Sequence, residues 1–200
     1  MNAYKYITKS FQQDYKSRSQ LVKQRIVEWR RQSPVTKTEK PTNIARAREL
    51  GYKAKQGVII ARVRVDRGLS KRRKIKAGRK PSKEGMFYAF RKSLQARAEE
   101  RAANRFTNCE VLNSYFVGED GNYKFFEVIL LDRTHPAIMN DPNYANVIAQ
   151  RGRATRGLTS AGKKFRGIVK KGFGTHQNRP SNISGMSRRN ASSGMKRRYS

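Results

Sequence analysis

Cysteine and histidine are almost absent from this chain of 200 residues. A single cysteine, Cys109, excludes a disulfide within the chain and a zinc site built from several cysteines. We predict that Cys109 is a small, buried apolar side chain. The two histidines, His135 and His176, are too far apart in sequence to form a local metal-binding motif. We therefore expect neither a metal nor another cofactor.

Long apolar runs are also missing. No stretch of 18 or more apolar residues occurs, so the sequence predicts no transmembrane helix and no membrane partner. The N-terminal sequence MNAYKYITKSF lacks the apolar segment of a signal peptide. These two absences lead us to expect a cytoplasmic protein.

Acidic residues are scarce as well: 14 Asp and Glu stand against 46 Lys and Arg, for a net charge of +32. Self-repulsion of this size destabilises a compact chain unless a polyanion neutralises it. Because the basic residues are spread along the whole chain, nucleic acid is the expected partner. Only 36% of the residues are hydrophobic, so we expect a small core with long extensions.

The few carboxylates do not form a recognisable catalytic site. Glu119 and Asp120 fall in a predicted hairpin turn, Asp132 closes a predicted strand, and Asp141 precedes a proline. A two-metal nuclease would need several carboxylates that converge on one place. We therefore expect no enzyme activity and no small-molecule substrate.

The stretch RGLTSAGKKFRG, residues 156–167, matches seven of the eight positions of a nucleotide-binding P-loop. The eighth position needs a hydroxyl to bind magnesium, and it is Lys164 here. The preceding AQRGRAT is not a buried strand, which a P-loop also requires. We predict instead that the glycines let the backbone approach the phosphates of a polymer, which the basic side chains neutralise.

Several segments have clear secondary-structure patterns. The first forty residues are predicted to be helical, and Trp29 either packs this segment on the domain or faces a ribose or base. Residues 57–66 are predicted to form a half-buried strand, because apolar and polar side chains alternate from Ala61 onward. Residues 109–117 and 123–131 are predicted to form a hairpin around GEDGN. The spacing of Phe87, Phe90, Leu94, Ala98 and Ala102 predicts a core helix over 86–105. Together these elements indicate a small α+β domain.

Two segments carry charge without a helix or strand period. Seven of the ten residues in 71–80 are basic, and we expect this loop to contact phosphates. After Asp141 the chain has 14 Lys and Arg, many glycines and no acidic residue, so we expect it to be unstructured until it binds. The predicted organisation is a helical basic segment at 1–40, an α+β core at 41–141 with a basic loop at 67–85, and a basic extension at 142–200.

Several motifs, in their order along the chain, resemble one known family. LGYKAKQG, VLNSYFVGEDGNYKFFEVIL and RGLTSAG are similar to the archaeal and eukaryotic large-subunit ribosomal protein fifteen of the "e" type, over nearly the whole chain. The resemblance implies a structural, noncatalytic protein of the cytoplasmic ribosome, bound to large-subunit ribosomal RNA beside other large-subunit proteins. It also implies a β-α-β-α-β-β core with a mostly antiparallel sheet, whose first short strand would lie near residues 34–37.

A basic chromatin or DNA-binding protein is the alternative, although the sequence shows no recognition helix. The residues that we expect to bind RNA are basic and lie in several segments of the chain. They are Lys53, Lys55, Arg62, Arg64, Arg67, Lys71, Arg72, Arg73, Lys74, Lys76, Arg79, Lys80, Arg151, Arg153, Arg156, Lys163, Lys164, Arg166, Lys170, Lys171 and Arg179.

Overall fold

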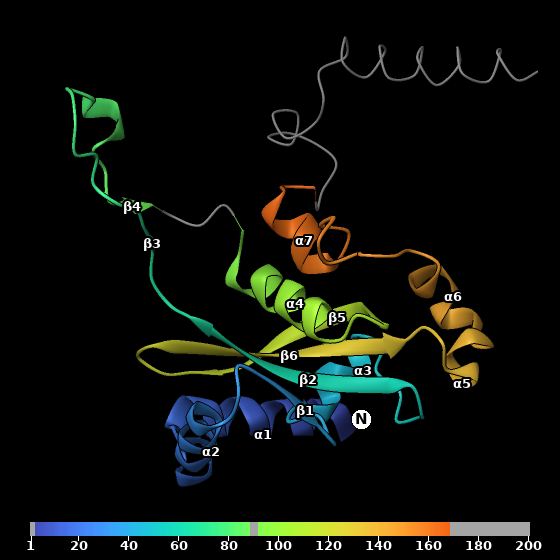
Figure 1. Cartoon of the computed structure of the whole chain (residues 1–200). Helices are drawn as coiled ribbons and strands as arrows, with labels where there is room; N and C mark the ends of the chain where they lie inside the picture. Colours follow the sequence, from blue (N-terminus) through green and yellow to red (C-terminus); the bar gives the residue numbers. More distant parts are fainter. Residues whose placement is uncertain (1–2, 89–91, 169–200) are drawn as a thin grey trace, which may run out of the picture.

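A four-stranded antiparallel sheet lies between two layers of helices in the computed structural model, which describes residues 3–88 and 92–168 (Figure 1). The strand order is β1-β2-β6-β5. The strands are β1 (Val35–Thr38), β2 (Val58–Asp66), β5 (Cys109–Glu119) and β6 (Tyr123–Asp132). This arrangement confirms the expected α+β fold, including the short first strand.

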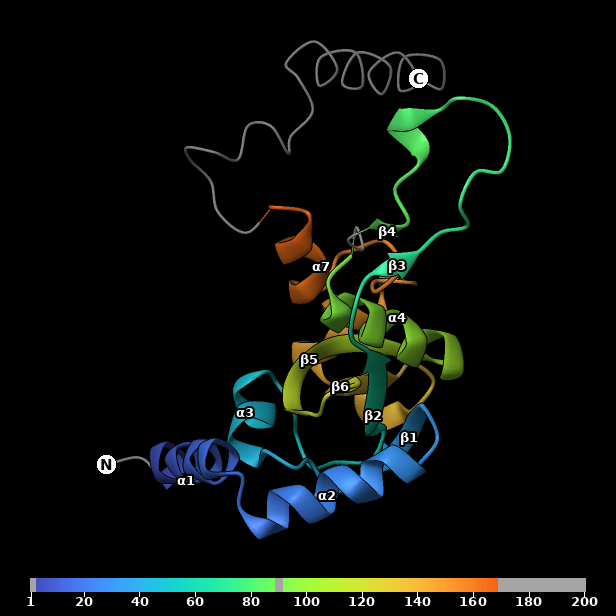
Figure 2. The ribbon, with the colours of Figure 1, turned by 90° about the vertical axis from the view of Figure 1, so that its left-hand side faces the viewer.

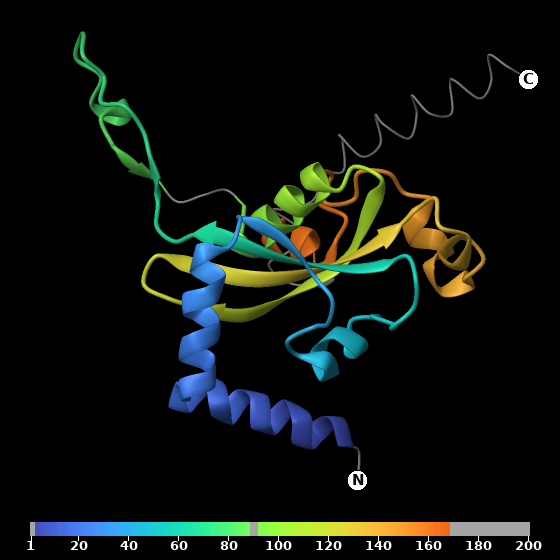
Figure 3. The same cartoon turned by 60° about the horizontal axis from the view of Figure 1, so that its bottom comes forward.

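The helices cover both faces of the sheet and one of its ends (Figures 1 and 3). One face carries α1 (Ala3–Ser17), α2 (Gln20–Arg31) and α3 (Ile44–Glu49). The other face carries α4 (Leu94–Arg105) and α7 (Ser160–Phe165). Beyond the end of β6 lie α5 (Pro136–Met139) and α6 (Pro142–Ile148). Figure 3 shows that α1 and α2 meet at a sharp elbow, where Arg18 has a φ of 49°.

The alternation of β2 places its apolar side chains on opposite sides of the sheet. Ala61, Val63 and Val65 are fully buried in the cluster under α4, whereas Ile60 belongs to the cluster on the other face. The central strand β6 is covered on both faces, which explains its nearly continuous apolar sequence FFEVILL. Two separate hydrophobic clusters therefore hold the two helical layers on one sheet.

Trp29 packs its helix on the domain, which resolves the two interpretations of this residue. Its side chain is buried, and its ring lies 5.5 Å from the ring of Phe125 between centroids. The short helix α3 has residues at both ends that favour helix termini. Asn43 caps it by accepting a hydrogen bond from the amide of Arg46, and Gly51 follows it with a φ of +98°.

The expected helix over 86–105 is wrong at its start, in residues 86–88 and 92–93. Helix α4 begins only at Leu94, because Ser93 caps it by accepting a hydrogen bond from the amide of Ala96. Phe87 instead lies in the short strand β4 (Phe87–Tyr88), which pairs with β3 (Ser70–Lys71). Its side chain is 64% exposed and takes no part in the core, whereas Phe90 lies outside the described residues.

The segment 142–168 is folded, contrary to the expectation that the chain is unstructured after Asp141. It contains α6, a series of turns and α7, and it packs on the core through Tyr144, Ala154 and Ala161. Its backbone is held at Gly152 and Arg153 by the carboxylate of Glu110, a distant residue that no local sequence pattern links to this segment. The rest of the expected extension, after residue 168, lies outside the described residues.

Candidate nucleic-acid interface

A hairpin formed by residues 67–88, called here the basic hairpin, projects from the end of β2 and stands clear of the body of the protein (Figures 1 and 2). Strands β3 and β4 form its stem, and the 3₁₀ helix η1 (Pro81–Lys83) lies near its tip. Seven predicted RNA-binding side chains on it are exposed, and none of them makes an ion pair with a described residue. They are Lys71, Arg72, Arg73, Lys74, Lys76, Arg79 and Lys80.

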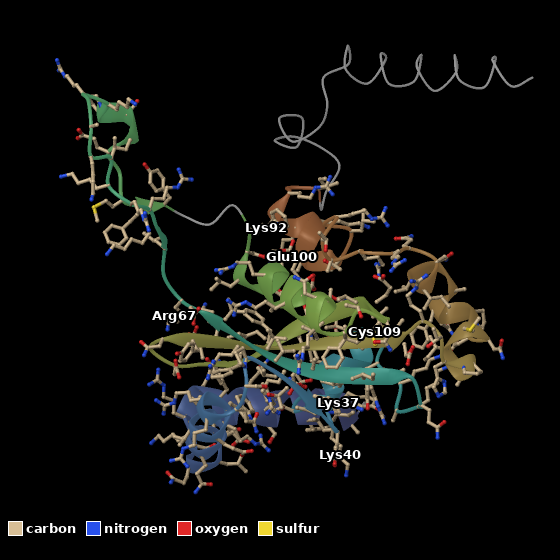
Figure 4. All side chains as sticks on the ribbon, viewed as in Figure 1. Lys37, Lys40, Arg67, Lys92, Glu100 and Cys109 are labelled. Atoms are coloured by element: carbon tan, nitrogen blue, oxygen red, sulfur yellow. The ribbon has the colours of Figure 1, made fainter. Side chains whose placement is uncertain are left out.

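Contacts with the body of the protein lie at the start of the basic hairpin and shortly after its end in the sequence (Figure 4). At the outgoing end, Arg67 donates a hydrogen bond of 2.8 Å to the carbonyl of Asp120 in the β5–β6 turn. Four residues after the hairpin, the ammonium group of Lys92 lies 2.5 Å from a carboxylate oxygen of Glu100 on α4. The positive charges beyond these anchors are therefore held away from the core.

Lys53 and Lys55 are brought together on the carboxylate of Asp141, at distances of 3.3 and 2.6 Å. Both ammonium groups also lie within 5.5 Å of the ring centre of Tyr144. The hydrogen bond from Lys55, followed by those from Asn143, holds the pKa of Asp141 well below its usual range. These lysines thus fasten the α5–α6 segment, and the Lys53 side chain remains about half exposed.

Arg62 is enclosed by the protein instead of facing solvent. Its guanidinium lies 4.3 Å from the ring centre of Trp29 and 3.6 Å from the carboxylate of Glu127, and its side chain is 12% exposed. Burial lowers the pKa of Arg62, and the Glu127 charge opposes this effect. Arg64, two residues along β2, lies over the ring of Tyr123 at 4.6 Å and is partly exposed. Arg62 therefore joins α2 to the sheet.

Arg153 is also turned inward. Its guanidinium donates a hydrogen bond of 2.8 Å to the carbonyl of Val111 on β5. The backbone amides of Gly152 and Arg153 both donate to the carboxylate of Glu110. Burial lowers the pKa of Arg153 as well, and the charges of Glu110 and Glu99 oppose this effect. This group of contacts fixes the turn before RGLTSAG against the edge strand of the sheet.

RGLTSAG forms a closely packed turn and helix, not an open cradle for phosphate. A Cβ atom at Gly162 would come within 3 Å of the backbone of Gly157, which has a φ of +66°. Thr159 caps α7 by accepting a hydrogen bond from the amide of Gly162, and its own hydroxyl donates to the buried carboxylate of Glu99. The expectation that these glycines let the backbone approach phosphates is thus wrong. Gly157 and Gly162 lack side chains because their backbones pack directly against each other.

The basic side chains around this turn remain at the surface. Arg156 and Arg166 each donate to backbone carbonyls of the same turn, Arg156 to Arg151 and Arg166 to Gly157. Within residues 151–168, turns and not a buried strand precede α7, so the requirements of a P-loop are not met. The exposed cations of this segment are Arg151, Arg156, Lys163, Lys164 and Arg166.

Three buried carboxylates contribute to the fold in ways that the sequence did not predict. Glu99 accepts hydrogen bonds from Ser114 and Thr159, and Glu127 accepts them from Thr42 and Tyr115. Glu110 holds the turn at residues 152–153. Glu127 had a signal, because one acidic residue inside the apolar run FFEVILL must lie on a covered strand and needs partners there. The partners of Glu99 lie 15 and 60 residues away, so no local pattern reveals them.

Other kinds of site find no support in residues 3–88 and 92–168. These residues contain no group of three or more His, Cys, Asp and Glu placed to hold a metal ion. No helix among them is both long and apolar enough to cross a membrane. Cys109 is buried, as expected. Three predicted RNA-binding residues, Lys170, Lys171 and Arg179, lie outside the described residues.

Comparisons with known proteins agree with the resemblance noted in the sequence. A family model described as Ribosomal L15 matches residues 2–185. The large ribosomal subunit protein eL15 of Metallosphaera sedula is 52% identical over 153 residues, which span 75% of this chain and 71% of that protein. The protein of the same name from Methanocorpusculum labreanum is 51% identical over 162 residues, which span 80% of this chain and 84% of that protein. The chain therefore belongs to the ribosomal L15e family.

Proposed function

We propose that this protein is a structural, noncatalytic constituent of the large ribosomal subunit, where it binds large-subunit ribosomal RNA mainly through phosphate contacts. Its family membership supports the ribosomal role. The observation that carries the RNA-binding part is the basic hairpin, with seven exposed cations that no described carboxylate neutralises. A polyanion that folds around such a projection releases its counterions, and this release drives binding.

The proposed interface consists of those predicted RNA-binding residues whose side chains are at least partly exposed. The basic hairpin supplies Lys71, Arg72, Arg73, Lys74, Lys76, Arg79 and Lys80, and the α7 segment supplies Arg151, Arg156, Lys163, Lys164 and Arg166. Lys53, Lys55, Arg64 and Arg67 contribute from positions partly committed to protein contacts. Arg62 and Arg153 are left out because they are held inside. Lys170, Lys171 and Arg179 stay in the proposal on their sequence alone.

The folded body and the basic hairpin have different roles in the proposed binding to RNA. The body of the protein docks on the RNA as a rigid unit, and the basic hairpin follows the irregular RNA surface. Most contacts are to phosphates, which fix position and orientation without reading sequence. Other large-subunit proteins are the expected neighbours, and the cytoplasmic ribosome is the expected location.

The test is co-sedimentation of the full chain with large ribosomal subunits in a gradient, followed by release with salt. Affinity for large-subunit rRNA and for duplex DNA is then measured over a range of salt concentrations. We expect tighter binding to the rRNA and a steep decrease as salt rises. A nearly flat salt dependence, or equal affinity for duplex DNA, would contradict the proposal.

Two variants test whether the exposed cations of the basic hairpin contribute to the salt dependence of RNA binding. Lys74→Ala removes an exposed cation with no ion-pair partner among the described residues, and it should reduce the salt slope by about one unit. Arg46→Ala removes a surface guanidinium that is already paired with Glu49 at 2.5 Å, so it should change the slope less. Equal effects of the two changes would contradict the role of the basic hairpin.

A further inference from the structure

Phe87 is an exposed aromatic ring on the stem of the basic hairpin. It is 64% exposed, although it belongs to a paired strand. Its partner across the two strands is Lys71, and directly opposed residues of an antiparallel pair point to the same face. One face of the stem therefore presents an uncovered ring with an ammonium group beside it.

The opposite face of the stem carries a ring that is already covered. The guanidinium of Arg72 lies 4.3 Å from the ring centre of Tyr88, and a Cβ atom at Gly85 would lie 2.8 Å from the Tyr88 hydroxyl. Tyr88 is thus packed between an arginine and the backbone, and it stiffens the stem. The amide of Arg72 also donates a hydrogen bond of 2.8 Å to the carbonyl of Met86. Phe87 is consequently an exposed aromatic ring on a stem that other contacts stabilise.

The charge around Phe87 indicates which partner covers it. Residues 67–88 contain nine Lys and Arg and a single acidic residue, Glu84. An apolar protein surface placed here would bury several of these cations without counter-charges, at a cost in desolvation. An unpaired nucleobase offers a flat ring for Phe87, and its own phosphates neutralise Lys71 and its neighbours.

We propose that Phe87 is a stacking platform for one unpaired nucleobase of RNA, with Lys71 beside it for the adjacent phosphate. This inference rests on the proposed function and extends it, because it adds recognition of a single-stranded base to phosphate contacts. Stacking depends on the flat face of the ring and not on charge. Loss of the ring should therefore change affinity without changing the salt dependence of binding.

The test compares Phe87→Leu and Phe87→Trp in the full chain. Phe87→Leu keeps an apolar side chain but removes the ring, so it should weaken binding to large-subunit rRNA by about fivefold or more at an unchanged salt slope. It should leave binding to a fully paired RNA duplex unchanged. Lys71→Ala is the control, and it should reduce the salt slope by about one unit for both RNAs.

Phe87→Trp preserves a stacking ring and adds a local fluorescent reporter. The one native tryptophan, Trp29, is buried, and the wild-type signal provides its background. Binding of a single-stranded oligoadenylate of about 12 nucleotides should quench the added fluorescence, whereas the duplex should not. A normal rRNA affinity of Phe87→Leu, or no quenching on a bound single strand, would overturn the inference and direct attention to a protein partner.

Failure of the two proposals can be told apart. If the wild type binds rRNA with a steep salt slope and Phe87→Leu binds equally well, only the stacking platform is lost. If the wild type shows no salt-dependent binding to rRNA, the proposed function fails and the stacking platform fails with it.

Discussion

A Cβ atom added to Gly162 would lie 2.6 Å from the Cα atom of Gly157, so helix α7 rests directly on the backbone of the turn before it. Gly157 has a φ of +66°, a conformation that glycine adopts without strain. The two glycines that suggested a nucleotide-binding loop therefore serve contact between two pieces of backbone. Their spacing reflects the packing of α7. The proposed contacts with RNA phosphates are made by the exposed lysines of this helix.

We predict that Gly162→Ala loosens α7. The added methyl group meets backbone atoms that cannot move aside, and overpacking of this kind costs about 1–3 kcal/mol. Urea unfolding and hydrogen exchange of the α7 amides measure the effect. Gly121→Ala is the control, because a Cβ atom there has nothing within 4 Å. Equal stability of the two variants would contradict the packing role of Gly162.

Glu99 should give the protein a distinctive pH dependence. Burial raises the pKa of the Glu99 carboxyl, and the hydrogen bonds from Ser114 and Thr159 oppose this effect. The folded protein therefore binds this proton more tightly than the unfolded chain does. Its contribution to stability is complete below the unfolded pKa of about 4.3 and is lost as pH rises through the higher folded pKa.

The measurement is the difference in unfolding free energy between the wild type and Glu99→Gln as a function of pH. Because the amide does not titrate, the wild type should gain relative to the variant as pH falls toward about 4.3. Thr159→Val is a second probe of the same contact, and removal of its hydroxyl should cost about 1–3 kcal/mol. A pH-independent difference between the wild type and Glu99→Gln would mean that Glu99 has no raised pKa.

Arg62 and Glu127 should behave as a buried pair. Arg62→Met leaves the buried Glu127 carboxylate without its cation, and such a loss costs about 3–5 kcal/mol. Glu127→Gln in the same chain should recover part of this loss, because the uncompensated charge is gone. Urea denaturation of both single variants and the double variant measures the coupling. Strictly additive effects would show that the two groups are independent.

Most of the sheet could be predicted from sequence, because its signals are local. The alternation of β2 and the two apolar runs of β5 and β6 depend on which side chains face a covered surface. The error at Phe87 has a local cause too: its spacing continues the helical period of α4 past the N-cap residue, Ser93. A serine before an alanine-rich helix indicates the start of the helix. The prediction placed the start earlier because it followed the spacing of the apolar residues instead.

The candidate site was less predictable, because charge composition does not reveal which cations are used inside the fold. Arg62 and Arg64 are two residues apart on one strand, yet Arg62 is enclosed beside Glu127 and Arg64 is partly exposed. This difference depends on where α2 crosses the sheet. Likewise, residues 142–168 have few aliphatic side chains of their own and fold against Glu99 and Glu110, which belong to distant segments.

Lys163 and Lys164 test whether α7 binds polymer phosphates or a nucleotide. Both side chains are exposed, so as point charges they should contribute alike. Lys163→Ala and Lys164→Ala should each weaken RNA binding by a similar amount and reduce the salt slope by about one unit. Calorimetry of the wild type with ATP and GTP is the complementary measurement. Micromolar, magnesium-dependent binding that Lys163→Ala abolishes would restore the nucleotide site.

Residues 73–80 of the basic hairpin should become ordered on RNA, and hydrogen exchange can follow this residue by residue. In the free protein, the amide of Arg72 should exchange more slowly than those of residues 73–80, because it donates a hydrogen bond to Met86. The latter amides lie among exposed like charges that repel one another. Bound rRNA should slow their exchange together, because phosphates remove that repulsion and cover the backbone. Strong protection of residues 73–80 without RNA would mean that the hairpin tip folds on its own, and unchanged exchange with rRNA would exclude it from the interface.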